Sequence, residues 1–409
     1  MPPMEPTPAG PPRDAIQFLV RLARALHNAG MPSHAIEESL ALVAIRLGVA
    51  AQFMATPTSI LISSGPWMHE TMHLLRVEPG EQNLARLSDV YEVTRAVVRA
   101  ELTPGEGAAR LEAIERAPTS YGTAASVAAM GLSSAAAARF LDGGLRELVT
   151  AAVIGVVLGL LGVAASRSDR IARLYDPLGA FTASFLAGLI AQVMPVSVFL
   201  ATLAGIIILI PGFTLTIALT ELSNRHLVAG TARLFGAFTT FVVIAIGVAF
   251  GTTLTAQLFG AQPVSTPEPL PGWTLAIALV AAPLSFTVLL KAKPRDAGWI
   301  VAACILGFAG SRAGSVVLGP DLGVFVGALV VGLAGSAYSH WWRRPPTVLR
   351  VPGILMLVPG SVGFRGLTAL LDRQVVPGVE TAFRMITIAV ALAAGLLIAS
   401  VVAPTRMTR

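Results

Sequence analysis

The sequence predicts a polytopic α-helical membrane protein, with about ten transmembrane helices in two inverted five-helix repeats and a small N-terminal cytoplasmic α/β domain. The prediction rests on the composition, on ten long apolar runs and on an internal repeat. Of the 409 residues, 54% are hydrophobic and 13% are charged, whereas charged residues make up about 25% of soluble domains. The basic residues lie in short clusters between apolar runs, which indicates membrane topology signals and argues against a nucleic-acid partner.

The N-terminal part differs from the rest in charge and in pattern. Residues 1–120 carry 13 acidic and 10 basic side chains, and 19 of the 29 basic residues follow them. Residues 1–15 are expected to be a disordered Pro-rich tail without a signal peptide, so the N-terminus is expected to stay in the cytoplasm. Hydrophobic periodicity and turn residues predict an α/β domain over 16–120. Its expected helices cover 16–28, 34–47, 83–100 and 104–116, and its expected strands lie within 50–64 and over 74–78.

Ten apolar runs follow, each long enough to cross a hydrocarbon core of about 30 Å as a helix. The first run is the weakest because it consists mostly of Ala, Gly and Ser, which suits a helix packed inside a bundle. The expected spans are 122–140, 146–164, 177–193, 197–221, 229–251, 272–290, 297–313, 321–339, 351–371 and 378–402. They form a first repeat over 121–255, an extracytoplasmic loop over 256–270, a second repeat over 271–403 and a cytoplasmic tail over 404–409.

The loop charges predict the orientation in the lipid bilayer. With the N-terminus inside, the cytoplasmic loops and tail hold thirteen Lys and Arg residues and the outer side holds six. Because basic residues are enriched in cytoplasmic loops, we expect a multi-pass protein of the cytoplasmic (inner) membrane with both termini cytoplasmic.

An internal repeat relates the two halves. Pro211-Gly212 aligns with Pro359-Gly360 at an offset of 148 residues, and Arg225 then aligns with Arg373. Further upstream, 178–189 aligns with 322–333 at an offset of 144. Five spans per half would make the second half enter the membrane from the opposite side, as in many secondary transporters. Chance alignment of apolar segments is the alternative.

The two Pro-Gly pairs predict broken helices within spans four and nine, because proline removes a helical hydrogen bond. A break exposes amides at the positive end of a half-helix, which suits a substrate carboxylate, and frees carbonyls for an ammonium group. A plain proline kink is the alternative. The candidate substrate-binding residues are Pro211, Gly212, Phe213, Thr214, Thr216, Pro359, Gly360 and Ser361.

Ionisable and polar residues cluster near the ends of the same spans. Groups of this kind at membrane depth usually mark transport pathways, and lipid-interface snorkelling or helix capping is the alternative. Glu221 is the expected acidic partner of the substrate or proton carrier. The candidate coupling or gating residues are Glu221, Asn224, Arg225, His226, Arg365, Asp372, Arg373 and Glu380.

Residues 69–73 read HETMH and satisfy the HExxH pattern of zinc proteases. That pattern needs a helix, whereas the surrounding sequence favours a strand, on which residues four apart lie about 13 Å apart. We therefore expect an ordinary loop and no metal site, with a metalloprotease or a loose metal site at His69 and His73 as alternatives. Glu37-Glu38 is expected to lie on an exposed helix face, with a catalytic pair as the alternative. The single cysteine, Cys304, and the missing Walker A motif indicate no cofactor and no bound nucleotide.

Three blocks carry a resemblance to a known family: FLVRLARALHNAGMPSHAIEESLALVAIRLGV, TPTSILIS and LIPGFTLTIALTELSNRHLVAGTARL. The chain resembles the threonine/serine exporter (ThrE-like) family in its fused form, which has both membrane halves on one chain. The resemblance implies a non-enzymatic secondary exporter of small polar amino acids, driven by proton antiport. A dicarboxylate (succinate-like) exporter is one alternative, and a membrane-embedded hydrolase that uses the N-terminal domain is another. A homo-oligomer is also open.

Overall fold

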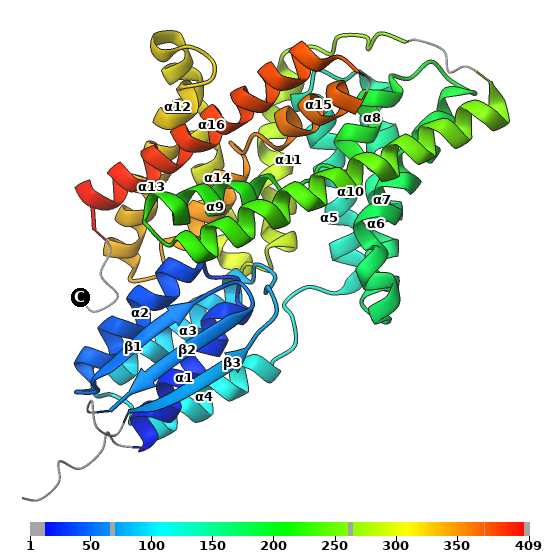
Figure 1. Ribbon diagram of the computed structural model, residues 1–409. Helices are drawn as coiled ribbons and strands as arrows, with labels where there is room; N and C mark the ends of the chain where they lie inside the picture. The colour runs from blue at the N-terminus through cyan, green and yellow to red at the C-terminus, as the bar shows by residue number, and fades with distance from the viewer. Residues whose placement is uncertain (1–12, 66–69, 261–264, 372, 405–409) are drawn as a thin grey trace, which may run out of the picture.

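The computed structural model describes residues 13–65, 70–260, 265–371 and 373–404. A mixed N-terminal part, coloured blue to cyan in Figure 1, lies against one side of a larger helical bundle. The two parts follow each other in the chain, because residues 13–116 form the first and the helices after Gly122 form the second.

The N-terminal part combines four helices with one antiparallel sheet of order β1-β2-β3. The helices cover one face of the sheet (Figure 1). Strand β2 alternates between buried and partly buried residues and turns Ile60 and Ile62 into the core, as expected for a strand with one covered face. The elements are α1 (Arg13–Asn28), α2 (Ser33–Arg46), β1 (Ala51–Ala55), β2 (Ser59–Ser64), β3 (Thr71–Arg76), α3 (Leu84–Val98) and α4 (Pro104–Arg116).

Local signals account for these element ends. Helix α4 starts with a capping box, in which Thr103 and Glu106 bond each other's backbone amides, and α3 starts at Asn83, whose side chain accepts from the Arg86 N–H. The third strand was expected at 74–78 but lies at 71–76. It pairs with the whole of β2, from Ser64 opposite Thr71 onward, and this pairing extends the strand toward its N-terminal side.

Seven helices of the described chain are long and apolar enough to cross a membrane, which makes the protein a polytopic helical membrane protein. Two of them continue across a turn or a break that separates shorter elements. These spans are Leu145–Ala165 (α6), Asp169–Ala191 (α7), Leu227–Phe259 (α10), Pro294–Leu318 (with α12, Ala297–Leu318), Gly323–Trp342 (α13), Thr347–Leu370 (α14, Thr347–Leu355, and α15, Gly360–Leu371) and Val375–Val402 (α16).

The three other expected spans are helical without meeting these criteria. They correspond to α5 (Thr123–Phe140), to α11 (Trp273–Leu289) and to the pair α8 (Val198–Gly205) and α9 (Gly212–Ser223). Helix α11 has 17 residues, and the α8–α9 pair is interrupted. Ten spans therefore stay a prediction, and seven helices have the length and the apolar composition that a span requires.

Two helices extend beyond the ranges expected from the sequence. Helix α7 begins at Asp169 instead of 177 and contains Pro177, because an acidic first turn stabilises the helix start ahead of the apolar run. Helix α10 has 33 residues and ends at Phe259, so the residues up to that point, expected to belong to a loop, are helical. Its hydroxyls bond back to the helix backbone, as Thr255 does to the Gly251 carbonyl at 2.8 Å.

Both Pro-Gly pairs interrupt their helices as predicted. Helix α8 ends at Gly205 and α9 starts at Gly212, directly after Pro211. Helix α14 ends at Leu355 and α15 starts at Gly360, directly after Pro359. Each break therefore starts a half-helix inside the bundle. The first amide of α9, that of Gly212, donates to the Ile210 carbonyl at 2.8 Å.

The turns after α9 and α15 have the same backbone geometry at an offset of 148 residues. Arg225 and Arg373 adopt left-handed φ angles of 64° and 63°. Each donates its backbone N–H to the residue three positions back, Leu222 at 3.0 Å and Leu370 at 3.1 Å. The aligned arginines thus occupy equivalent turn positions, which is a conformation that few non-glycine residues adopt.

The packing of α7 on α10 also matches that of α13 on α16. A Cβ on Gly247 would lie 2.5 Å from the Pro177 carbonyl oxygen, and a Cβ on Gly395 would lie 2.5 Å from that of Phe325. Both pairs differ by 148 residues. In this packing contact the corresponding residues are 148 positions apart, whereas the sequence alignment of the upstream segments has an offset of 144.

Candidate functional site

The two helix breaks meet inside the bundle. A Cβ placed on Gly212 would lie 2.9 Å from the Cα of Gly360, and it would overlap the Val358 side chain. Only glycine permits this approach of two backbones. Helices α9 and α15 leave the meeting point toward opposite sides of the bundle (Figure 1).

This meeting point concentrates positive electrostatic potential. The first amides of a helix have no partner within the helix, and each helix start carries the equivalent of about half a positive charge. Within the described chain, no acidic side chain hydrogen-bonds to the first amides of α9 or α15. Two such ends in contact favour an anion, and a carboxylate is the ordinary biological anion of this size.

The predicted substrate residues differ in whether their side chains are already engaged. The Thr216 hydroxyl donates to the Gly212 carbonyl at 3.1 Å, and Phe213 packs against an apolar cluster that contains Leu349. Thr214 and Ser361 are half-buried, and in the described part of the chain their hydroxyls make no hydrogen bond. Pro211 and Pro359 precede the two helix starts directly.

Glu221 lies at the far end of α9, nine residues beyond Gly212 and so about 13 Å along the helix. Its carboxylate is fully buried. The Arg233 Nε lies 3.1 and 3.2 Å from its two oxygens, and the backbone N–H of Ser33 donates to it at 2.9 Å. Glu221 therefore joins α9 to α10 and to the first turn of α2, and the structure does not bring it to the breaks.

The other predicted coupling residues lie on the two turns and on exposed helix faces. Asn224 donates to the Thr220 carbonyl at 3.0 Å, and His226 Nδ1 lies 3.4 Å from Glu37 Oε2. Arg225 is exposed. Asp372 lies outside the described residues. The remaining exposed residues of this set are Arg365, Arg373 and Glu380.

Sequence reasoning did not connect the N-terminal part with these turns. Glu37 was expected on an exposed helix face, whereas it accepts the Ala55 N–H at 2.7 Å and pairs with His226. Ser33 and Arg233 were not predicted as partners of Glu221. The opposite net charges of the two parts of the chain were the available signal, because acidic residues of the N-terminal part contact basic residues of the bundle.

Those contacts fix the N-terminal part on the bundle. Glu81 pairs with Lys291, Asp89 with Lys293, and Glu92 with Arg295 at 3.8 Å. Helix α3 also donates its first amides to the two carbonyls that directly follow α11, from Leu84 to Leu290 at 3.0 Å and from Ala85 to Lys291 at 3.1 Å. The unpaired ends of two helices thereby satisfy each other.

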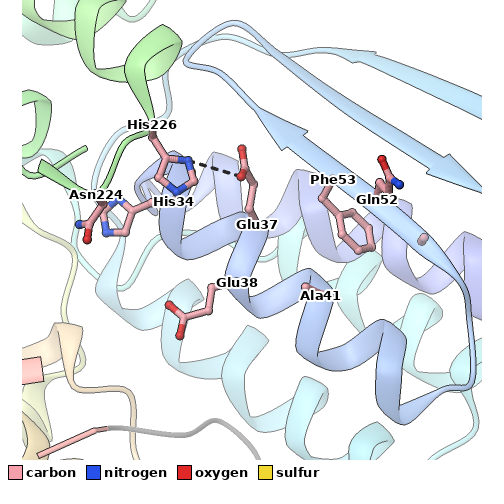
Figure 2. Close-up of a pocket in the computed structure, with 9 residues that line it drawn as sticks. His34, Glu37, Glu38, Ala41, Gln52, Phe53, Asn224 and His226 are labelled. Atoms are coloured by element: carbon pink, nitrogen blue, oxygen red, sulfur yellow. Dashed lines mark ion pairs between the residues drawn. The ribbon is translucent and has the colours of Figure 1, made fainter. Parts of the chain in front are cut away.

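A cavity of about 550 Å³ lies between α2, β1 and the α9–α10 turn. Figure 2 shows Glu37 extending from α2 toward His226, which comes from the α9–α10 turn, while Glu38 points away from this pair. The rings of His34 and His226 are 5.9 Å apart. The cavity is lined by His34, Glu37, Glu38 and Ala41 from α2, by Ala51, Gln52 and Phe53 from β1, and by Asn224 and His226 from the turn.

The histidine on α2 is held in its neutral form. Burial, together with nearby His226 and Arg233, lowers the pKa of His34 to about 4. The Nδ1 atom of His34 is buried and has no hydrogen-bond partner in the described structure. At neutral pH the cavity therefore combines two glutamates with a neutral imidazole from α2.

The HExxH pattern does not form a described metal centre. His73 lies in β3 opposite Ile62, so the loop expected at this histidine was wrong. His69 lies outside the described residues. Glu70 bonds to the Ser63 hydroxyl. Among the described residues, no group of three or more His, Cys, Asp or Glu side chains lies close enough to hold a metal ion.

Comparison with known proteins identifies two family matches. Residues 17–255 match the family described as "Putative threonine/serine exporter" (ThrE), and residues 275–402 match the family described as "Threonine/Serine exporter, ThrE". The matches begin at α1 and end with α16, so they include both helix breaks.

Similar curated proteins come from fungi. The chain is 25% identical to pheromone-regulated membrane protein 10 of Pichia sorbitophila, over 85% of this chain and 36% of the relative. The corresponding protein of Eremothecium gossypii is also 25% identical, over 85% of this chain and 48% of the relative. An uncharacterized protein of Schizosaccharomyces pombe is 27% identical, over 86% of this chain and 48% of the relative.

The chain thus spans between about a third and a half of the length of these relatives. No solved structure matches the chain. Because the two exporter families together cover the chain from residue 17 to residue 402 with one short gap, the protein belongs to the ThrE family of threonine/serine exporters, in the form that carries both membrane parts on one chain.

Proposed function

We propose that the chain is a secondary active exporter of small polar amino acids, which binds the substrate carboxylate where α9 and α15 begin. The observation that carries the proposal is the backbone contact between Gly212 and Gly360. Two half-helix starts in contact offer several amide donors to one carboxylate at no cost in buried charge. The hydroxyls of Thr214 and Ser361 add uncharged hydrogen-bonding groups beside these amides.

The ammonium group of the substrate would bind the carbonyls freed by the breaks. Residues 206–211 and 356–359 lie outside the flanking helices. The carbonyls of Ile206, Ile210, Pro211 and Pro359 accept backbone N–H groups, and the other carbonyls of these segments would receive the cation. A zwitterion suits this pairing of amides and carbonyls, and a small side chain such as that of threonine or serine fits beside the two glycines.

Alternating access would come from two inverted halves. The matching turns at Arg225 and Arg373, and the matching glycine contacts at Gly247 and Gly395, support a repeat of 148 residues. With ten spans, both termini and the N-terminal part would lie in the cytoplasm of a cell whose inner membrane holds the bundle. The loops that contact the N-terminal part, around Lys291 and Arg343, are among those expected on that side.

Protons are the proposed coupling ion, with Glu221 as a gate and not a substrate ligand. A proton on its carboxylate would remove the charge that holds Arg233 and would loosen α9 from α10. Helix α9 starts at the proposed substrate site and ends near Glu221. A displacement of its Glu221 end would therefore also displace its start at the substrate site.

A dicarboxylate exporter is the second candidate. Two positive helix starts would suit two carboxylates, and no described acidic side chain bonds to this meeting point to hold an ammonium group. Counterflow of radiolabelled threonine and of radiolabelled succinate into proteoliposomes separates the candidates. Threonine exchange without succinate exchange supports the amino-acid exporter, the reverse supports the dicarboxylate exporter, and exchange of neither contradicts both.

A further inference from the structure

Helix α14 carries a cation that no described acidic side chain neutralises. Arg350 is half-buried in the segment Thr347–Leu370, which has the length and the apolar composition of a membrane span. Among the described residues, no carboxylate lies within ion-pair distance of its guanidinium. Charged groups in such segments are costly, and they usually mark the path of a substrate or an ion.

Neutral groups of α13 engage only part of this guanidinium. Arg350 Nη2 donates to the Ser336 hydroxyl at 2.7 Å, and Nε and Nη2 both lie 3.4 Å from the Gly332 carbonyl oxygen. A guanidinium has five N–H donors, and Nη1, which carries two of them, has no hydrogen-bond partner in the described structure. A carboxylate matches the remaining donors, because its two oxygens accept parallel bonds from a guanidinium.

Contacts along α13 place Arg350 between the N-terminal part and the second helix break. A Cβ on Gly327 would lie 3.0 Å from the side chain of Leu357, which is in the break, and a Cβ on Gly335 would lie 2.7 Å from Arg350 Cγ. The two glycines are eight residues apart in one helix, so these levels are separated by about 12 Å. Beyond the level of Arg350, the loop between α13 and α14 accepts a hydrogen bond from Arg95 of α3.

The helix before the first break carries a polar side chain at the matching position. Thr202 of α8 lies 148 residues before Arg350. Three residues further on, Gly205 and Gly353 each pack tightly against a neighbouring helix, since a Cβ on either would lie 2.5 or 2.6 Å from a side chain. The Thr202 hydroxyl is buried and has no hydrogen-bond partner in the described structure. Both helices that lead into a break therefore carry unfilled hydrogen-bonding capacity at the same place.

We propose that Arg350 binds the substrate carboxylate on its way from the side of the N-terminal part to the helix breaks. From this entry site the carboxylate would move about two helical turns to the amides at the starts of α9 and α15. The uncompensated cation would attract carboxylates and discriminate against neutral amides. The role as an entry step rests on the proposed function, whereas the binding of a carboxylate at Arg350 does not.

Thermal unfolding of the detergent-solubilised full chain tests the binding, with acetate as the probe. Acetamide has the same shape without the charge, and sodium chloride keeps the ionic strength constant. We expect acetate alone to raise the thermal midpoint, and Arg350→Met to weaken the apparent acetate affinity by about tenfold or more. Arg312→Met, at an exposed arginine of α12, is the matched control and should respond to acetate like the wild type.

The same measurement without acetate separates a binding residue from a structural one. Replacing an unpaired, partly buried charge by an apolar side chain of similar length should leave the midpoint at or above that of the wild type. Arg350→Lys keeps the charge without the fork of donors, so its acetate affinity should lie between those of the wild type and Arg350→Met. In proteoliposomes, Arg350→Met should raise the KM for threonine exchange by about tenfold or more.

Gly212→Ala, which alters the helix breaks, separates this site from the proposed transport site. It should keep the part of the acetate response that Arg350→Met removes. Wild-type exchange in Gly212→Ala would contradict the site at the breaks and leave the Arg350 site standing. The inference is overturned if acetate does not raise the wild-type midpoint or if Arg350→Met responds to acetate like the wild type. It is also overturned if Arg350→Met is less stable without acetate, or if phosphatidylglycerol and not acetate gives the response that depends on Arg350.

Discussion

The carboxylate of Glu221, in helix α9 of the bundle, accepts the backbone N–H of Ser33 at 2.9 Å, in the first turn of helix α2 of the N-terminal part. The two residues are 188 positions apart. Glu221 also pairs with Arg233, so one buried side chain connects three helices. The N-terminal part is thereby joined to the helix that starts at the proposed substrate site.

Removing this carboxylate should destabilise the folded protein. Glu221→Ala leaves the Arg233 guanidinium without its partner, and loss of one member of a buried pair costs about 3–5 kcal/mol. We expect a clearly lower thermal midpoint of the detergent-solubilised protein. Glu380→Ala, at an exposed glutamate of α16, should stay within about 0.5 kcal/mol of the wild type. Equal midpoints for the two variants would show that the Glu221 contacts carry little energy.

Acidification should weaken the N-terminal part through His34. Its pKa is about 4 in the folded chain and 6.5 in the unfolded chain, so the unfolded chain binds more protons between these values. The free energy of unfolding should therefore fall as the pH drops from about 6.5 toward 4. Burial also lowers the pKa of His27, which adds to the effect in the same direction.

Thermal unfolding of the solubilised protein across this pH range checks the effect. His34→Gln should flatten the dependence, while His73→Gln, in strand β3, should retain the wild-type slope. A His34→Gln protein that loses stability with acid as steeply as the wild type would exclude His34 as the cause.

The inverted arrangement predicts opposite sides for two equivalent loops. Arg167 follows α6 and Pro320 follows α12, both at exposed positions. Cysteines introduced there should react differently with an impermeant reagent added outside the cell, with Pro320→Cys labelled and Arg167→Cys protected until the membrane is opened. Cys304 is buried and should contribute no background. Labelling of both loops from outside would rule out the inversion.

The sequence predicted those features that depend on neighbouring residues. The Pro-Gly pairs located both helix breaks, and hydrophobic periodicity with turn residues located α3 and α4, because these signals act within a few positions. The end of α10 was missed because polar residues that resemble a loop continue a helix when their hydroxyls bond the backbone one turn back, as Thr255 does. The start of α7 was missed because its acidic first turn precedes the apolar run.

Long-range partners could not be predicted in the same way. Glu37 has the pattern of an exposed helix face, and only the docking of the α9–α10 turn places His226 beside it. Glu221 was expected near the substrate because it lies in the same predicted span as Pro211. The 12-residue helix α9 instead places Glu221 near one of its ends and the helix break at the other. The contact of Gly212 with Gly360 likewise needs both halves of the bundle in place.

Counterflow of radiolabelled threonine into proteoliposomes, with Gly212→Ala compared with Gly236→Ala, tests the central claim most directly. A Cβ on Gly212 would press against the backbone of Gly360 and move the two helix starts apart, whereas a Cβ on Gly236 meets open space. The account predicts that Gly212→Ala loses threonine exchange by about tenfold or more and that Gly236→Ala exchanges at the wild-type rate. Wild-type exchange in Gly212→Ala would contradict a substrate site between α9 and α15.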